Sequence, residues 1–184
     1  MEFNESRTFG NLQKAMDCEM RSSMMYSMYA ENAQKEQLRP IAQVFNRLSE
    51  NEKAHAEIWK RLISDGRKET TADNLKNAAL EEQNQWMKMY EEYANIAAEE
   101  GYMEISDLFR RVALIEHHHD ILLAGLRKAL ETDCLFCCEE ETIWICTNCG
   151  YLYYGNCAPE KCPVCGYPKE YYEKLNDEED NCKN

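Results

Sequence analysis

Two Glu-x-x-His motifs are the residues in this sequence whose types and spacing most directly indicate chemistry. They are Glu52 with His55 and Glu116 with His119. Residues three positions apart lie on the same face of a helix, so each glutamate and its histidine point in the same direction. Carboxylate and imidazole side chains on one helix face are typical metal ligands. Each motif therefore predicts part of a metal centre.

An internal repeat relates the two motifs. A shift of 64 positions superimposes the first motif on the second. Glu19 falls on Glu82 at a shift of 63, whereas Tyr26 falls on Tyr90 at a shift of 64. One residue is therefore extra between Glu82 and Tyr90, and a single insertion in a helix is usually absorbed as a π-bulge. We predict a π-bulge in this stretch.

Four glutamates of the repeat lie on helix faces that are otherwise apolar. A buried carboxylate is costly unless it is paired or binds a metal. Four such acids, with one imidazole for each of two ions, suit a di-iron or di-manganese centre. The simpler alternative, that these glutamates are solvated surface residues, is disfavoured because both motifs occupy matched repeat positions. The predicted ligands are Glu19, Glu52, His55, Glu82, Glu116 and His119.

Two Cys-x-x-Cys-Gly sequences near the end of the chain predict a second kind of metal site. Each such turn directs backbone N–H groups toward a thiolate sulfur, and two of them complete a tetrahedral four-sulfur site for iron or zinc. The spacing does not separate these two metals. The predicted ligands are Cys146, Cys149, Cys162 and Cys165. Aromatic residues are expected to form the small core around them: Trp144, Tyr151, Tyr153, Tyr154, Tyr167 and Tyr171.

Six cysteines remain outside this four-sulfur site. The Cys134-x-x-Cys137 spacing fits a further metal, a redox pair or a linker thiol pair without function, and we favour the last. We interpret Cys18 as a small packing residue. The roles of the others stay open at this point: they are Cys138, Cys157 and Cys182.

Long helices followed by a small module must position these residues. Apolar residues recur at three- or four-residue steps from Asn11, and Pro40 suits the first turn of a second helix that ends near residue 64. A third helix, capped by Thr71 or Asp73, is predicted over about residues 72–100, with Gly101 at its left-handed C-terminus. A fourth helix over about residues 103–130 completes a bundle.

Composition excludes several classes of protein. The chain has 184 residues, 34 acidic against 21 basic, a net charge of −13 and a pI of about 4.8, so it would repel nucleic-acid phosphate. It lacks an apolar run long enough to span a membrane, and it has no apolar signal-peptide core at its start. We therefore expect a cytoplasmic protein whose 10 cysteines serve metal or redox chemistry rather than disulfides.

In these motifs the chain closely resembles the rubrerythrin family, which joins a ferritin-like di-iron bundle to a C-terminal rubredoxin-like module. The resemblance extends from about Asn11 to Tyr172. It is carried by NLQKAMDCE, ENEKAH, NLKNAALEEQNQWMKMY and IEHHH, and by the twelve residues between Cys149 and Cys162. It implies a mainly α fold, with a ferritin-like four-helix bundle over residues 1–132 and a rubredoxin-like four-cysteine iron module over residues 140–184.

The resemblance also implies an activity, its cofactors and its partners. Two non-haem irons in the bundle would reduce hydrogen peroxide to water, as part of defence against oxidative stress. The rubredoxin-type iron, for which zinc is the alternative, would pass on electrons from a reductase or rubredoxin that draws on NAD(P)H. Tyr26 and Tyr90 are expected either to hydrogen-bond the glutamate ligands or simply to pack beside them.

One position departs from the family pattern. The family has Glu-x-x-Glu on the third helix, but here Glu82 is followed by Gln85. The second family glutamate binds iron in the oxidised state, and a carboxamide is a much poorer ligand than a carboxylate. We infer that His55 stays on its metal in both redox states and that the peroxide-reducing form survives; the alternative is an inactive site.

The connection between the second and third helices is short for a ferritin-like bundle, in which these helices run parallel. Residues 64–73 would have to span about 28 Å, and nine extended residues reach only about 30 Å. We therefore favour a homodimer in which helices 1 and 2 of one chain pair with helices 3 and 4 of another, an arrangement that some rubrerythrins resemble. A closed bundle within one chain is the alternative.

Two other functions compete with peroxide reduction. One is a ferritin-like iron-binding protein or ferroxidase without peroxidase turnover, and the other is a structural zinc module on a degenerate bundle. The fused four-thiolate site favours the enzyme because iron storage has no need of an electron inlet.

Overall fold

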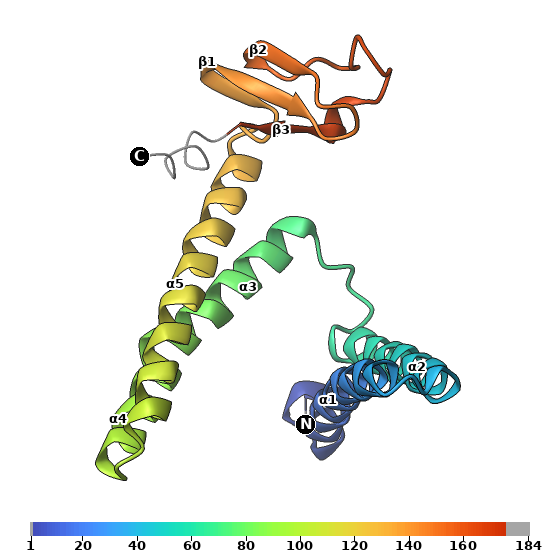
Figure 1. The fold of residues 1–184 in the computed structure, drawn as a ribbon, viewed down its shortest axis with the longest axis vertical. Coiled ribbons are helices and arrows are strands. Elements are labelled where there is room, and N and C mark those ends of the chain that lie inside the picture. The colour runs from blue at the N-terminus through green and yellow to red at the C-terminus, as the bar shows by residue number, and fades with distance from the viewer. Residues whose placement is uncertain (1, 176–184) are drawn as a thin grey trace. The chain divides into compact units, whose positions relative to one another are not determined.

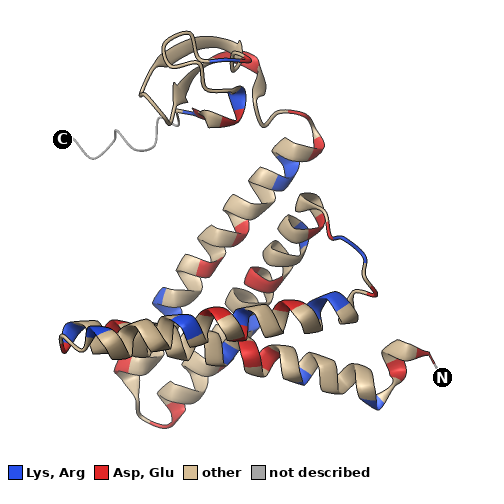
Figure 2. Cartoon of the chain, turned by 90° about the vertical axis from the view of Figure 1, so that its right-hand side faces the viewer, with Lys and Arg blue, Asp and Glu red and all other residues tan. Residues whose placement is uncertain are grey.

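The computed structural model describes residues 2–175, so Cys182 and the end of the predicted second domain lie outside the described residues. The chain divides into two units, residues 1–69 and 70–184, which we describe separately. Among residues 2–175, none of the helices combines the length and the apolar character of a membrane span. Lys and Arg are interspersed with Asp and Glu along the helices (Figure 2).

The first unit is a hairpin of two long helices (Figure 1). A short 3-10 turn, η1 (Phe3–Glu5), precedes α1 (Arg7–Lys35), and α2 (Arg39–Ile63) follows. The Ser6 hydroxyl caps α1 by accepting the Phe9 N–H at 3.1 Å. Pro40 lies in the first turn of α2, as predicted, where its missing N–H costs nothing.

The second unit begins with another helical hairpin, which is interrupted on one side. Its first arm consists of α3 (Thr71–Asn84), the π-helix η2 (Gln85–Met89) and α4 (Tyr90–Glu99), and its second arm is α5 (Met103–Glu131). The predicted insertion is thus confirmed as a π-helix, in which the Tyr90 N–H bonds back to the Gln85 carbonyl.

The ends of the third helix were predicted with one error. Thr70, and not Thr71, is the cap: its hydroxyl accepts the Asp73 N–H at 3.1 Å, and the Asp73 carboxylate accepts the Thr70 N–H at 3.0 Å. This reciprocal capping box provides acceptors for two backbone N–H groups at the start of the helix, whereas the Thr70 hydroxyl alone would bond only one of them. Gly101 has a φ of 88°, as predicted for the residue that ends this arm.

The two hairpins bury the same repeat positions. Ala30 and Ala33 are buried in the first hairpin, and Ala94 and Ala97 are buried 64 positions later in the second. Small residues at these positions allow the two helices of each hairpin to approach closely. Many large apolar side chains remain exposed on both hairpins, with Leu114 as much as 70 % exposed. Each hairpin therefore has an apolar face that its own two arms do not cover.

A three-stranded antiparallel sheet follows α5. It has the order β2-β1-β3 and consists of β1 (Cys137–Cys146), β2 (Leu152–Cys157) and β3 (Tyr172–Lys174). The register places Trp144 opposite Tyr153 and Cys146 opposite Tyr172. Because alternate strand residues face the same side, Trp144 and Cys146 both enter the core of the module.

The aromatic core of this module differs from the sequence-based expectation. Trp144 is buried and Tyr151 packs against the core, as expected, but Tyr154 is 65 % exposed because it points to the other face of β2. Tyr172, which sequence reasoning left out, is buried beside the cysteines. The adjacent Tyr171 instead contacts Tyr167 edge to face, with ring centroids 4.7 Å apart.

Candidate metal centres

The first candidate ligand group lies on the α1–α2 hairpin. Glu19 comes from α1, and Glu52 and His55 come from successive turns of α2. The Nδ1 atom of His55 lies 3.0 Å from Oε2 of Glu52 and 3.8 Å from Oε2 of Glu19. Each residue offers a ligand atom within 4.8 Å of the others, so one cation can contact all three.

The second group has the same geometry on the second hairpin. Glu82 comes from α3, and Glu116 and His119 come from α5. The Nδ1 atom of His119 lies 2.8 Å from Oε2 of Glu116 and 3.8 Å from Oε2 of Glu82. The structure thus gathers the six predicted helix ligands into two equivalent sets of three, one on each hairpin.

The second group fits a cation because one of its carboxylate oxygens is buried without a hydrogen bond. Among the described residues, Oε2 of Glu82 has no hydrogen-bond partner. Burial raises the pKa of Glu82, and the neighbouring Glu116 raises it further. A carboxylate in this position is stabilised by a positive charge, which a divalent ion supplies.

In the first group, the pKa of a glutamate is lowered rather than raised. A side-chain hydrogen bond with Glu19, followed by one with His55, holds the pKa of Glu52 below its ordinary value. Two carboxyl groups in direct contact need either a shared proton or a shared cation. The donor set of two carboxylates and one imidazole suits iron or manganese.

The ligand residues are less buried than the sequence indicated. The side chains of Glu52 and Glu116 are 19 % and 16 % exposed, and those of His55 and His119 are 51 % and 45 % exposed. The burial expected for carboxylates on otherwise apolar helix faces is therefore incomplete within the single chain. The reason is that the two arms of a hairpin cover only one side of each ligand.

The residues that were predicted to support these ligands are placed as follows. Gln85 is half-buried at the first position of the π-helix, immediately after α3. Tyr26 stacks on Phe45, with ring centroids 6.1 Å apart, and Tyr90 packs on Phe109 at 6.0 Å. These matched ring contacts agree with a packing role for both tyrosines, and a hydrogen bond from their hydroxyls to the glutamate ligands stays a prediction.

Sequence reasoning missed a polar contact that holds the π-helix against α5. The Trp86 Nε1–H donates to Oδ2 of Asp120 at 3.1 Å, and its ring lies 4.3 Å from that of His117. In the first hairpin, α1 and α2 are linked instead by two hydrogen bonds: the Ser23 hydroxyl donates to the Ser49 carbonyl, and the Ser49 hydroxyl donates to the Ser23 carbonyl. The one sequence feature that could have indicated this contact is the position of Trp86 inside the predicted π-bulge. This contact fixes the backbone next to the second ligand group.

The four predicted cysteines form the third candidate group. The Sγ atoms of Cys146 and Cys165 are 3.7 Å apart, and those of Cys149 and Cys162 are 3.6 Å apart. A tetrahedral ion with metal–sulfur bonds of about 2.3 Å places sulfurs about 3.8 Å apart. These two pairs already have that spacing, and all four sulfurs lie within 4.8 Å of one another. The turns depend on Gly150 and Gly166, whose φ values of 75° and 74° disfavour other residues.

Neighbouring groups shift the acidity of these thiols in opposite directions. The Tyr151 N–H lowers the pKa of Cys149, but burial and the three neighbouring thiols outweigh it and raise that pKa to about 12. Burial raises the pKa of Cys162, but the Tyr172 hydroxyl and two backbone N–H groups outweigh it and lower that pKa to about 6. The Tyr167 N–H and the Asn148 side chain also lower the pKa of Cys165. Thiolates are thus favoured at Cys162 and Cys165, whereas a cation is needed to stabilise the thiolate of Cys149.

Acidification is expected to release the metal from this cysteine site. In the metal-free chain, the depressed pKa of the Cys162 thiol stabilises the fold above the ordinary thiol pKa, and this contribution is lost as the pH falls through about 6. A bound cation keeps the thiolates ionised, so release of the metal occurs at a lower pH. Visible absorption of the metal-loaded chain against pH measures the release. A Tyr172→Phe variant, which lacks the hydroxyl, should lose metal at a higher pH than a Tyr171→Phe control. Identical midpoints would contradict this assignment.

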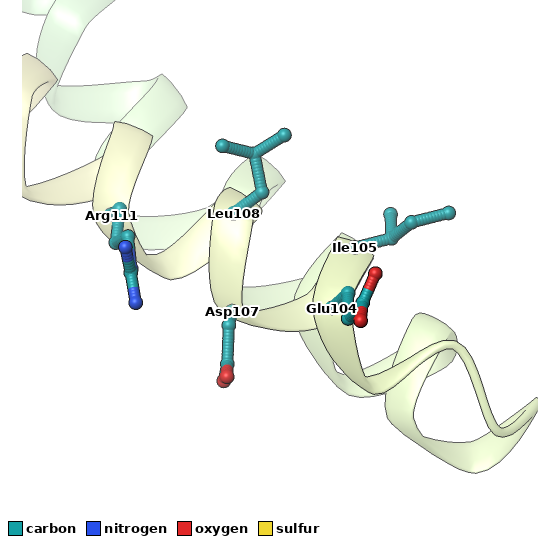
Figure 3. A pocket seen from close by; sticks show the side chains of 5 residues that line it. All are labelled: Glu104, Ile105, Asp107, Leu108 and Arg111. Carbon is teal, nitrogen blue, oxygen red and sulfur yellow. The ribbon is translucent and has the colours of Figure 1, made fainter.

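A shallow hollow of about 470 Å³ on α5 is not part of any ligand group (Figure 3). Leu108 points to one side of the helix and Asp107 to the other, and Asp107 pairs with Arg110 at 3.5 Å. The hollow offers no nucleophile and no set of metal ligands. Its lining consists of Glu104, Ile105, Asp107, Leu108 and Arg111.

Comparison with known proteins places this arrangement in a family. The model of the family described as Rubrerythrin matches residues 10–127 and 73–141, and that of the rubrerythrin rubredoxin-like domain matches residues 144–173. The chain belongs to the rubrerythrin family. Its predicted mainly α fold with a rubredoxin-like module is thereby confirmed, and the two Glu/Glu/His groups and the four cysteines are ligand sets consistent with iron.

Two relatives that are more than 30 % identical agree with this membership in the rubrerythrin family. A rubrerythrin of Porphyromonas gingivalis is 34 % identical over 181 residues, covering 92 % of this chain and 90 % of the relative. The rubrerythrin of Nitratidesulfovibrio vulgaris is 31 % identical over 181 residues, covering 92 % and 95 %. A structure of fully reduced, all-ferrous nigerythrin is 23 % identical and covers 92 % of this chain and 87 % of its own, at a TM-score of 0.35.

Proposed function

We propose that this chain is a peroxide reductase that converts hydrogen peroxide to water. The observation that carries the proposal is the presence, in one chain, of two carboxylate–imidazole groups and a four-thiolate group. Bound iron would supply the one-electron redox chemistry that these side chains lack. A cytoplasmic location and a reductase or rubredoxin that draws on NAD(P)H belong to the same proposal, as does the division into domains at residues 1–132 and 140–184.

The residues of the chain have separable roles in this proposal. Glu52 and Glu116 hold the imidazoles of His55 and His119 in place through bonds of 3.0 Å and 2.8 Å to their Nδ1 atoms. Glu82 offers a buried oxygen that lacks a hydrogen-bond partner among the described residues. The four thiols accept one metal at low reorganisation cost because their sulfurs already lie within 4.8 Å of one another.

The test is a full cycle with peroxide and a reductant. The chain is loaded with iron without oxygen, treated with hydrogen peroxide and then reduced, while absorption of the thiolate–iron site and peroxide consumption are followed. We expect colour changes that reverse on each cycle and catalytic loss of peroxide. Iron that is oxidised once without turnover would instead favour iron handling. Zinc in the cysteine site with a metal-free bundle would contradict the enzyme.

Replacement of Gln85 by glutamate is expected to change the oxidised state of the proposed di-iron centre, where the new carboxylate would compete with His55 for its metal. The new carboxylate would stand next to Glu82 at the start of the π-helix, where the present carboxamide is a poor ligand. We expect the rate of one half-reaction, oxidation or re-reduction, to change by about tenfold, as for other residues that support metal ligands. Stopped-flow measurement of both steps, with the exposed Gln83→Glu as the control, tests this. Unchanged rates in both steps would contradict it.

We further propose a homodimer in which each complete centre combines the first hairpin of one chain with the second hairpin of the other. Two features support it: the exposed apolar face of each hairpin, and the short connection of residues 64–70. A chain with an intact bundle would contain both ligand groups of its own centre.

Mixing two inactive variants distinguishes these arrangements. A Glu52→Ala chain has a defective first group, and a Glu116→Ala chain has a defective second group. In a swapped heterodimer one centre has both defects and the other has none, so refolding an equal mixture should restore about a quarter of the peroxide turnover. A mixture of Glu19→Ala and Glu52→Ala chains is the control and should restore none. No recovery in the first mixture would favour the unswapped bundle.

A further inference from the structure

The structure contains a disulfide that none of the three metal-ligand groups uses. Cys137, the first residue of β1, is bonded to Cys157, the last residue of β2, and the two are direct cross-strand partners. The sequence indicated a linker thiol pair made of Cys134 and Cys137, and the structure corrects that pairing. The reason is that folding β2 against β1 brings a cysteine from 20 positions along the chain closer than the local one.

The surroundings of this disulfide make one of its sulfurs accessible. Cys157 is exposed and Cys137 is half-buried. An incoming thiolate therefore reaches Cys157, and Cys137 is the leaving group. Accessible disulfides of this kind are exchanged by thiols, whereas buried ones serve as permanent cross-links.

The remaining thiols nearby are kept apart from this exchange. Cys138 follows Cys137 in the same strand, so its side chain points to the opposite face, where it packs against the module core. The Sγ of Cys134 donates to the Thr132 carbonyl at 3.4 Å. The pair is thus able to open and close without shuffling to a neighbouring cysteine.

Opening the disulfide leaves other links between the strands intact. The Ala158 N–H donates to the Phe136 carbonyl at 2.8 Å, and the Asn156 side chain donates to the Glu139 carbonyl at 2.9 Å. The Trp144 Nε1–H donates to the Gly155 carbonyl at 3.0 Å. Reduction is therefore a local event that should leave the four-thiolate site in place.

We propose that Cys137 and Cys157 form a reversible two-electron thiol couple, separate from the metal sites. In reduction, one thiolate of an external dithiol bonds to the Cys157 sulfur and releases the Cys137 thiolate. The second thiol of the dithiol then displaces Cys157, so the dithiol leaves as a disulfide. In oxidation, hydrogen peroxide converts the Cys157 thiolate to a sulfenic acid with release of hydroxide. Cys137 then displaces the second hydroxide, which gives the disulfide and, with protons, two waters in total.

Native thiol trapping tests this couple without depending on turnover at the metal sites. The experiment uses the full-length chain with the Glu116→Ala substitution, so that turnover at the metal sites does not consume the added peroxide. The chain is reduced with dithiothreitol, separated from the dithiothreitol and then treated with one equivalent of hydrogen peroxide. Each stage is trapped with N-ethylmaleimide under native conditions, and the labelled peptides are identified by mass spectrometry. We expect two alkylated residues, Cys137 and Cys157, to be gained together on reduction and lost together on oxidation.

Matched variants make the outcomes decisive. A Cys157→Ser chain should lose the two-thiol change completely, whereas a Cys138→Ser chain should keep it. Absorption of the metal-loaded cysteine site should be unchanged between the two thiol states. The proposal is overturned if the disulfide resists dithiothreitol in the folded chain, because it is then a structural cross-link. It is equally overturned if peroxide leaves both thiols reduced, or if Cys157 pairs with Cys134 or Cys138.

Discussion

Replacing Cys162 with serine is expected to abolish metal binding at the four-thiolate site and to unfold the module around it. Cys162 is only 2 % exposed and belongs to the small buried core with Trp144 and Tyr172. A hydroxyl does not replace a thiolate as a ligand, and binding of a structural metal contributes about 10–16 kcal/mol in small domains of this type. So few buried residues cannot hold the module together without that contribution.

Two spectroscopic signals measure this loss. The thiolate–metal absorption should disappear, and near-ultraviolet circular dichroism from Trp144 should collapse. The far-ultraviolet helical signal should persist, because the helices are not built on this site. Cys134→Ser is the matched control, since Cys134 lies outside the four-thiolate group, and it should keep one metal in the module. A Cys162→Ser chain that keeps its metal and its dichroism would disprove the assignment.

Replacing Glu82 with glutamine is expected to weaken metal binding at the second helical group by at least about 100-fold, since even residues behind the ligands cost about 10–100-fold. Peroxide turnover should fall with it. The variant removes a carboxylate whose Oε2 is buried and without a hydrogen-bond partner among the described residues. Metal titration and peroxide consumption measure the two effects. Glu81→Gln, at the exposed neighbouring position, should change neither.

The same Glu82→Gln variant should have the opposite effect on the metal-free chain. The pKa of Glu82 is raised by burial, so the folded chain disfavours its ionised form. Its contribution to stability is therefore present below the ordinary pKa and lost as the pH rises through the raised value. Thermal unfolding without metal should show a higher Tm for the variant at neutral pH and a smaller loss of Tm with rising pH. A lower Tm would show that Glu82 is already stabilised without a cation.

Residue spacing was enough to predict those parts of this protein that depend on local geometry. In the Glu-x-x-His motifs and the Cys-x-x-Cys-Gly turns, the ligand side chains point in the same direction because they are only three residues apart in a helix or a turn. The repeat then predicted the π-helix between Glu82 and Tyr90, since counting residues is enough to find an insertion. Pro40 and Gly101 marked helix ends for the same local reason.

Contacts between distant elements, in contrast, could be known only from the folded chain. The bond between Cys137 and Cys157, the contact of Trp86 with Asp120 and the burial of Tyr172 all join residues far apart in the chain. Such contacts depend on strand register and helix rotation, which a one-residue change would alter. The partial exposure of the ligand side chains could not be predicted from the sequence either. Burial depends on how many helices cover a helix face, and the sequence pattern of that face does not give this number.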